Sequence, residues 1–357
     1  MLTNALKSLN GPILITGHTG FKGSWLSLLL NHLGIEHFGY SLEAEEGSLY
    51  KRANLERVSS GVVGDIRDLE NLSKVVKDVR PSVIIHLAAQ PIVLKSYQEP
   101  LQTFQTNAMG TANVLKAAFD TPSVEIVLVI TTDKVYRNNN SGRRFVESDP
   151  LEGKDPYSAS KVAAEAVCAS WQQISNISGG PKVIVARAGN VIGGGDFAKD
   201  RLLPDVIRAV LKDESLVLRK PKATRPWQHV LDPIYGYLQY IEAALQRDKF
   251  PHALNFGPSE KSISVSEVVN FVQEYYQGKL KVKFTTDSVP KEENSLDLDS
   301  TLAYSFLGWH TKLDPRQSTI WTLDWWDRVN KKKIEPVEAS KENLRDFLGL
   351  MQPKSNF

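Results

Sequence analysis

Residues 12–23 read PILITGHTGFKG, and this stretch decides the fold. A short apolar run, residues 12–16, is followed by Gly17-His18-Thr19-Gly20-Phe21-Lys22-Gly23 and then by a periodic apolar segment, residues 23–33. Strand, glycine turn and helix in this order are typical of a dinucleotide-binding βα unit. The spacing G-x-x-G-x-x-G permits a tight turn and a close approach of the backbone to pyrophosphate. We therefore expect phosphate groups to bind this loop, at the positive end of the helix dipole.

Apolar strands alternate with helical segments along the first half of the chain. The expected strands lie at residues 12–16, 36–41, 81–87, 124–131 and 182–187, and the expected helices at residues 23–33, 68–78, 100–119 and 157–174. This alternation predicts an α/β protein whose doubly wound (Rossmann) parallel sheet is covered by helices on both faces.

The pattern changes after residue 187, where a glycine-rich loop, short strands and a basic loop follow. Ser264 and Glu267 have the spacing of a capping box ahead of an apolar stripe, so a helix is expected at residues 264–276. Two domains are expected: a dinucleotide-binding domain of residues 1–188 with a return segment near 229–257, and a smaller mixed α/β C-terminal substrate-binding domain of residues 189–228 and 258–357.

The composition excludes several classes of protein. The 357 residues include 43 Lys and Arg against 41 Asp and Glu, which gives no electrostatic reason to expect nucleic acid or an anionic membrane as a partner. The apolar runs are far shorter than the roughly 20 residues of a spanning helix, and the first residues lack the layout of a secretory signal. The single cysteine, Cys168, excludes an intrachain disulfide, and no histidine spacing indicates a metal site. We expect a cytoplasmic protein.

The end of the second strand bears on the choice of cofactor. A dinucleotide fingerprint has an acidic residue there to grip the ribose hydroxyls, but Ser41 occupies the place and Glu43 lies just past it. NAD is the expected cofactor. NADP is the alternative, because a missing carboxylate removes repulsion of a 2′-phosphate, which Lys22 could attract. Asp65 and Ile66 follow the next expected strand, where the carboxylate either accepts from the adenine amino group or caps a turn.

The same loop offers a rival interpretation as a Walker loop, which would indicate a mononucleotide kinase. That motif requires the order Gly-Lys-Ser/Thr, whereas Lys22 precedes Gly23 here. The order of residues therefore favours the dinucleotide.

A Tyr-x-x-x-Lys sequence opens the helix expected at residues 157–174. The spacing puts the Tyr157 and Lys161 side chains on one helix face, where the ammonium group should lower the pKa of the phenol and make it a usable base. Thr131-Thr132-Asp133-Lys134 stands at the carboxyl end of the preceding strand, an end that faces the cofactor crevice of a doubly wound sheet. The two segments together predict a catalytic site over the nicotinamide.

These segments resemble the extended short-chain dehydrogenase/reductase family, and within it the nucleotide-sugar 4,6-dehydratases that act on CDP-glucose. The resemblance runs from about residue 12 to about residue 258 and rests on TGHTGFKGSW, HLAAQPIVLKSY, TNAMGT, TTDKVY, DPYSASK, ARAGNVIGGGDFAKDR and RPWQHVLDP. It implies an NAD-dependent, redox-neutral conversion of a nucleotide hexose to a 4-keto-6-deoxy sugar nucleotide. Such an enzyme oxidises C4, eliminates water across C5 and C6, and returns the hydride to C6.

The resemblance also implies roles for individual residues. Tyr157 would remove the 4-OH proton while Thr132 hydrogen-bonds the same oxygen. Asp133 would protonate the departing 6-OH, and Lys134 would be either the base at C5 or an electrostatic stabiliser of the enolate. Further cofactor contacts are implied for Lys161, Leu87, Ala88, Ala89 and Thr106. Substrate contacts are implied for Gln90, Asn190, Arg201, Arg225 and His229.

Substrate phosphates need cations, and guanidinium forks suit phosphate oxygens. Arg187, at the end of a strand, and the pair Asp200-Arg201 are candidates, although an exposed arginine is often only solvated. The family resemblance further implies a homodimer in which helices 100–119 and 157–174 pair with their copies.

Two other functions are compatible with part of this pattern. Epimerisation at C4 would need only Tyr157, Thr132 and NAD, and a non-catalytic NAD(P)-binding sensor would need no intact acid and base. The presence of both Asp133 and Lys134 favours dehydration.

Overall fold

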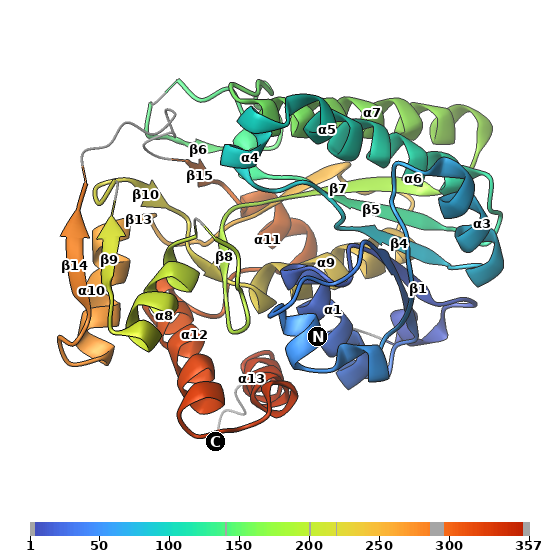
Figure 1. Ribbon diagram of the computed structural model, residues 1–357. Helices are drawn as coiled ribbons and strands as arrows, with labels where there is room; N and C mark the ends of the chain where they lie inside the picture. Colours follow the sequence, from blue (N-terminus) through green and yellow to red (C-terminus); the bar gives the residue numbers. More distant parts are fainter. Residues whose placement is uncertain (1–3, 140, 200, 219, 286–295, 353–357) are drawn as a thin grey trace, which may run out of the picture.

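The computed structural model describes residues 4–139, 141–199, 201–218, 220–285 and 296–352 (Figure 1). Within these residues the centre is a seven-stranded sheet in the order β12-β7-β5-β4-β1-β2-β3, and all neighbouring strands are parallel. Its strands are β1 (Ile13–Thr16), β2 (His37–Ser41), β3 (Ser60–Val63), β4 (Val83–His86), β5 (Ile126–Ile130), β7 (Lys182–Ala188) and β12 (Ala253–Phe256). The expected doubly wound sheet is confirmed, and β12 extends it at one edge.

Helices cover both faces of the sheet (Figure 1). One face carries α3 (Leu69–Val79), α6 (Gly110–Phe119) and α7 (Pro156–Ser178), and the other carries α1 (Phe21–Leu33) and α9 (Leu231–Gln246). Successive strand residues point to opposite layers, as the pleat requires. Leu14 and Val127 pack in the first layer, whereas Ile13 and Leu128 pack in the second. Burial on both faces explains why these strands are almost entirely apolar.

The helix expected at residues 100–119 contains an irregular turn. α5 (Pro100–Phe104) passes into a π-helical turn, Gln105–Met109, before α6 begins. Asn107 in this turn is 1% exposed, and its amide group donates to the Gln90 carbonyl oxygen (3.1 Å) and to the Ser160 hydroxyl (2.8 Å). Such turns inserted into α-helices are frequent at functional sites, and this one directs a polar side chain toward α7.

Most elements after β7 lie beside the sheet (Figure 1). They are β8 (Val191–Ile192), α8 (Leu202–Lys212), β9 (Ser215–Leu218), β10 (Thr224–Arg225), β11 (Gln228–His229), β13 (Ile263–Ser264), α10 (Val265–Tyr275), β14 (Lys281–Phe284), β15 (Asp297–Leu298), α11 (Thr301–Leu307), α12 (Pro315–Asn330) and α13 (Pro336–Gly349). The expected capping box is confirmed. Ser264 Oγ accepts from the Glu267 N–H (3.2 Å), and the Glu267 carboxylate accepts from the Ser264 N–H (2.7 Å).

Several short elements connect the main ones. They are η1 (Ala5–Ser8), α2 (Leu49–Arg52), η2 (Leu55–Arg57), α4 (Val93–Gln98), η4 (Asp133–Val135) and β6 (Arg144–Phe145). β6 pairs in parallel with β15, which attaches the segment after η4 to the C-terminal part of the chain.

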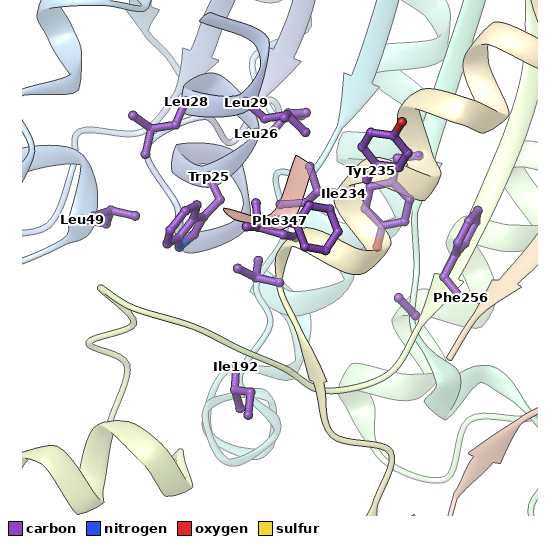
Figure 2. Packing of buried hydrophobic residues seen from close by; sticks show 14 of the residues in the cluster. Trp25, Leu26, Leu28, Leu29, Leu49, Ile192, Ile234, Tyr235, Phe256 and Phe347 are labelled. Atoms are coloured by element: carbon purple, nitrogen blue, oxygen red, sulfur yellow. The ribbon is translucent and has the colours of Figure 1, made fainter. Parts of the chain in front are cut away.

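One hydrophobic cluster joins the sheet to the C-terminal helices (Figure 2). Trp25 and Leu29 of α1, Ile234 and Tyr235 of α9, and Phe347 of α13 are all buried in it. The Phe347 ring meets the Tyr235 ring edge to face, with 6.1 Å between the centroids. α13 therefore packs against α9, and it also contacts α1, the helix that begins at the glycine loop.

No helix of the described residues combines the length and the apolar composition needed to cross a membrane. Among the same residues, no group of three or more His, Cys, Asp or Glu side chains is arranged to hold a metal ion. Cys168 is 1% exposed within α7, where its sulfur packs in the core.

Candidate active site

The glycine loop lies at the carboxyl end of β1, which pairs with β2 on one side and with β4 on the other. Ligands of doubly wound sheets bind at such a switch point. Gly17 has a φ of 78°, and a Cβ on it would lie 2.7 Å from the Ala88 nitrogen. A Cβ on Gly23 would lie 2.2 Å from the Gly17 carbonyl oxygen. Only glycine allows these close approaches of loop, strand end and helix.

α1 begins directly at this loop, with Gly20 as its N-cap and Phe21 as its first residue. In the described structure no side chain caps the helix, so its first amide groups are not engaged by a capping side chain. A helix N-terminus with free amides and a glycine cradle fits a pyrophosphate group.

The His18 side chain points away from this cradle into the sheet. It is 3% exposed, and its ring lies against the backbones of Gly39 and Gly61, where an added Cβ would come within 2.2 and 2.7 Å of the ring. Burial and the charge of His37 lower the pKa of His18 to about 4, so the imidazole is neutral at pH 7. A buried neutral ring is poorly suited to binding phosphate, which leaves the backbone of residue 18 for that purpose.

Hydroxyl groups occupy the place where a ribose-binding carboxylate is usual. Ser41 is 5% exposed, and its Oγ lies 3.1 Å from His18 Nδ1 and 2.8 Å from Thr19 Oγ1. Both hydroxyls also reach the Leu42 carbonyl oxygen, at 3.0 and 3.1 Å. The Ser41 side chain is therefore fixed by its neighbours at the end of β2.

Asp65 follows β3 and lines a surface pocket of about 530 Å³. The other lining residues are Arg67, Asp68, Gln105, Met109 and Asn113. Arg67 donates to the Asp65 carboxylate through Nε (2.9 Å) and Nη2 (2.5 Å), and these bonds lower the pKa of Asp65. Ile66 is buried and packs against Gly110. An adenine amino group would therefore meet a carboxylate that is ionised and already paired.

Lys22 extends from the loop toward α9 and away from the ribose end of the loop. Its Nζ lies 3.4 Å from the Tyr237 hydroxyl. Burial and the charge of Arg201 lower the pKa of Lys22 to about 7, and the charges of Asp133 and Lys161 also act on it. Lys22 thus belongs to the catalytic cluster, and the expectation that it would attract a 2′-phosphate is wrong. The motif spacing identifies the loop but not the direction of this side chain.

Tyr157 and Thr132 meet as expected between α7 and the end of β5. Both are buried, with exposures of 8% and 6%. Burial raises the pKa of Tyr157 to about 12, while a hydrogen bond with Thr132 and the charge of Arg201 act in the opposite direction. Burial of the phenol outweighs the lowering of this pKa that was expected from Lys161, whose Nζ donates to the Ile130 carbonyl oxygen (3.0 Å). Burial lowers the pKa of Lys161 itself to about 8.

Asp133 lies beside Thr132, whose hydroxyl donates to Asp133 Oδ1 (3.0 Å). The carboxyl is 3% exposed, and burial raises its pKa against the opposing charges of Lys134 and Arg225. Its Oδ2 would be 3.0 Å from a Cβ on Gly189, so this glycine makes room for the acid. A buried carboxyl with a raised pKa is suited to donating a proton. Lys134 is half-buried on η4.

The loop after β4 is fastened to both strands and helices. Leu87 donates its N–H to the Thr16 carbonyl oxygen (3.0 Å), and the Ala88 N–H reaches Thr16 Oγ1 (3.3 Å). Gln90 is held by Asn107, whose Oδ1 accepts from its N–H at 2.8 Å. Ala89 and Thr106 are half-buried in this loop and in the π-helical turn, respectively.

The Gln90 side chain forms its hydrogen bonds within the protein. Its amide nitrogen donates to Thr103 Oγ1 (2.9 Å), and its oxygen accepts from the Ile92 N–H (2.7 Å). Sequence reasoning missed Asn107, which ties this loop to Ser160 on α7. It lies in the TNAMGT segment on which the resemblance rests, but nothing in that segment indicates which groups its amide would bind.

Two arginines approach the catalytic cluster from the C-terminal part of the chain. Arg201 precedes α8, pairs with Asp196 (3.1 Å), and acts electrostatically on Lys22 and Tyr157. Arg225 on β10 acts on Asp133. Asn190 is half-buried between β7 and β8. Asp200 lies outside the described residues.

Two expected ligand contacts are corrected by burial. Arg187 forms a bidentate ion pair with Glu165, at 2.9 Å for both bonds, so its guanidinium is engaged inside the protein and not by a phosphate. His229 is 0% exposed and lies edge to face against Trp25 and Trp321. Its ring is part of the core and cannot reach a substrate.

The glycine loop lies at the switch point of a parallel sheet, where dinucleotides bind. Tyr157 and Lys161 on a later helix face Thr132 and Asp133 at a strand end, and such side chains can move protons at a hydroxyl-bearing carbon. The fold and the site together are those of a dinucleotide-dependent enzyme. The chain belongs to the NAD dependent epimerase/dehydratase family, whose sequence model matches residues 13–257.

The chain is similar to three named dehydratases, one by sequence and two by structure. The chain is 35% identical over 348 residues to a CDP-glucose 4,6-dehydratase of Salmonella typhimurium, which covers 94% of this chain and 96% of the relative. An NAD-dependent NDP-hexosamine 5,6-dehydratase involved in tunicamycin biosynthesis is 25% identical, with a TM-score of 0.74 over 89% of this chain and 98% of that one. A dTDP-glucose 4,6-dehydratase from Streptomyces venezuelae, solved with NAD bound, is 24% identical and shares the fold, with a TM-score of 0.77 over 91% and 99%.

Proposed function

We propose that the protein dehydrates CDP-glucose to the corresponding 4-keto-6-deoxy sugar nucleotide, with NAD as a recycled cofactor. The observation that carries the proposal is the buried Asp133 carboxyl, which touches Thr132 and has a raised pKa beside Tyr157. Epimerisation at C4 needs no such acid, whereas departure of the 6-OH does. The 35% identity to a CDP-glucose 4,6-dehydratase supports the choice of substrate.

The residues of this chain divide the reaction into proton transfers. Tyr157 would take the proton of the 4-OH once the positive charge of bound NAD lowers the pKa of its phenol, and Thr132, which is hydrogen-bonded to it, holds the same oxygen. Asp133 gives its proton to the departing 6-OH, so that water leaves. Bound NAD would supply the hydride chemistry, accepting the C4 hydride and returning it to C6. The glycine cradle around Gly17 and the pocket beside Asp65 fit its pyrophosphate and adenosine.

The proton from C5 needs a base, and two amines are candidates. Lys134 adjoins Asp133 on η4, and Lys22 has a pKa lowered to about 7 within the same cluster. We retain Lys134 as the proposed base because of its place beside the acid, and assign Lys22 to the electrostatics of the site.

We further infer how the two parts of the chain share the ligands. Residues 1–188 and 229–257 would hold the cofactor, since α9 and β12 continue the layers of the parallel sheet. Residues 189–228 and 258–357 would hold the sugar nucleotide, with Arg201 and Arg225 supplying charge for its phosphates. The structure offers no comparable role for Arg187 or His229.

We also infer a homodimer and a cytoplasmic location. Large apolar side chains are exposed along α5, the π-helical turn and α7: Leu101 (72%), Met109 (59%), Ile174 (44%) and Ile177 (73%). Large apolar side chains that are exposed on neighbouring helices are compatible with an interaction surface there. The single cysteine, buried and unpaired, is compatible with a reducing compartment.

The test is a direct assay with CDP-glucose and, in parallel, dTDP-glucose and UDP-glucose. The proposal predicts an alkali-induced absorbance of a 4-keto sugar, greatest with CDP-glucose. Asp133→Asn should lower kcat by about 10²–10⁴-fold, because the amide cannot donate an acidic proton. Asp120→Asn, which alters a surface ion pair with Lys116, serves as the matched control and should keep full activity. Absence of a keto product with all three substrates would refute the proposed function.

A further inference from the structure

A buried ion pair that the proposed reaction does not use lies behind the catalytic residues. Glu165 of α7 and Arg187 of β7 form two hydrogen bonds of 2.9 Å, and their side chains are 6% and 7% exposed. Glu165 stands one helical turn after Lys161 on the helix that carries Tyr157. The pair therefore connects the catalytic helix to the strand next to β5.

The ion pair grips the catalytic segment at both of its ends. Thr131, directly before Thr132, donates its hydroxyl to Glu165 Oε1 at 2.6 Å. Tyr136, directly after η4, accepts a hydrogen bond of 2.9 Å from Arg187 Nη1. Residues 132–134, which include the proposed acid, are thus bracketed by one carboxylate and one guanidinium.

The groups beyond Tyr136 in this hydrogen-bond network are also paired. The Tyr136 hydroxyl donates to Asn255 Oδ1 (2.6 Å), and Asn255 Nδ2 donates to the Phe145 carbonyl oxygen (2.9 Å). Tyr136 is 1% exposed and Asn255 is 0% exposed. Arg187 Nη1 also donates to the Glu147 carbonyl oxygen (2.9 Å), so each group in the network has a partner.

A buried ion pair is weak evidence for stability, because desolvation of the two charges offsets much of their attraction. Its contacts here have a more specific effect. They fix the strand end that bears Thr132 and Asp133 relative to the helix that bears Tyr157. A displacement of catalytic groups by about 1 Å can lower the rate about a hundredfold.

We propose that Glu165 and Arg187 are positioning residues for the two catalytic steps. Glu165, through its hydrogen bond with Thr131, aligns Thr132 with Tyr157 for oxidation at C4. Arg187, through its hydrogen bond with Tyr136, aligns Asp133 for elimination. This inference rests on the proposed function. In the first step the C4 hydride passes to the nicotinamide and the O4 proton to Tyr157. In the second step a base removes the C5 proton, the C6–O bond breaks, and Asp133 protonates the oxygen to give water.

The two ends should therefore fail in different ways. Tyr136→Phe removes only the hydroxyl and retains the ring, which stacks on Phe145. It should slow elimination more than oxidation, so reduced cofactor accumulates during turnover. Thr131→Val removes only the hydrogen bond to Glu165 and should slow oxidation, so the cofactor stays oxidised. Both variants keep the ion pair, which avoids a lone buried charge.

The experiment measures kcat and the near-ultraviolet absorbance of reduced nicotinamide in the holoenzyme turning over CDP-glucose. We expect kcat to fall about tenfold to a hundredfold in both variants, with a several-fold higher reduced fraction in Tyr136→Phe alone. Tyr276→Phe and Thr121→Val are the matched controls. They remove hydroxyls that bond to Asp327 Oδ1 (3.1 Å) and to the Ala117 carbonyl oxygen (2.9 Å), away from the site.

The outcomes are distinguishable. If both variants lose no more activity than their controls, or show the same reduced fraction as wild type, the positioning role is refuted while the proposed function stands. If the wild-type enzyme itself gives no keto product, the proposed function is refuted and this inference with it. A high reduced fraction confined to Tyr136→Phe supports the assignment of that end to elimination.

Discussion

The Lys161 ammonium group donates a hydrogen bond of 3.0 Å to the carbonyl oxygen of Ile130, the last residue of β5. The second member of the Tyr-Lys pair is thereby tied to the strand that carries Thr132 and Asp133. Burial of the side chain lowers the pKa of Lys161 to about 8.

We expect the pH profile of kcat/KM to fall above about pH 8. The pKa of Lys161 is lowered to about 8, so the cation is present below that pH and is lost as the pH rises through it. Lys161→Arg should retain its charge beyond pH 12, which should remove this alkaline limb even though activity is lower throughout. An unchanged limb in Lys161→Arg would assign it to another group.

Gly23→Ala should weaken NAD binding and destabilise the fold. The new Cβ would lie 2.2 Å from the Gly17 carbonyl oxygen and 2.6 Å from His18 Cα, so the loop must move away from α1. Overpacking of this kind costs about 1–3 kcal/mol, measurable by urea unfolding, and NAD affinity can be followed by titration calorimetry. Gly349→Ala is the control, since no atom lies within 4 Å of its added Cβ. Equal NAD affinity in both variants would contradict the cradle.

Asp232→Asn should stabilise the protein at pH 8 more than at pH 5. Asp232 is 0% exposed, Oδ1 accepts from the Lys312 N–H (2.7 Å), and Oδ2 has no partner among the described residues. Burial raises its pKa from 3.8 to about 7. The stabilisation from the protonated form is complete below pH 3.8 and is lost as the pH rises to about 7.

The size of this effect follows from the pKa shift. A shift of about three units corresponds to roughly 4 kcal/mol between the two limits. Asparagine stays neutral and keeps an acceptor for the Lys312 N–H, so the variant should escape most of that loss. Urea unfolding of both proteins at pH 5 and pH 8 measures it. A gain in unfolding free energy that does not depend on pH would show that Asp232 does not titrate in this range.

Leu101→Glu should convert the protein to a monomer. Leu101 is 72% exposed on α5, one of the elements of the proposed dimer surface. A carboxylate at the centre of an apolar interface would have to be desolvated on association. Sedimentation velocity measures the oligomeric state. Val217→Glu, at a position 55% exposed on β9, is the control and should leave the assembly unchanged.

The sheet was predictable because its signals are local. Short β-branched runs separated by helical periods specify buried parallel strands. The π-helical turn at Gln105–Met109 was not predictable, because it depends on where the Asn107 amide finds partners in Gln90 and Ser160. Periodicity averaged over residues 100–119 cannot detect one extra residue in a turn.

The positions of site residues were predictable where a motif specifies the backbone conformation. The orientation of individual side chains was less predictable. Tyr157, Thr132 and Asp133 meet as the resemblance implied. Arg187 and His229 were expected at ligands, yet one pairs with Glu165 and the other packs between indole rings. The sequence does not reveal whether a charged or polar side chain has a buried partner within the protein.

The packing of α13 on α1 has a consequence for synthesis of the protein. Trp25 and Leu29 emerge from the ribosome long before Phe347, which covers the same cluster (Figure 2). Until then the nascent chain presents an uncovered apolar helix face, available to chaperones. Full ordering of the nucleotide cradle at the start of α1 should therefore wait until α13 has been synthesised.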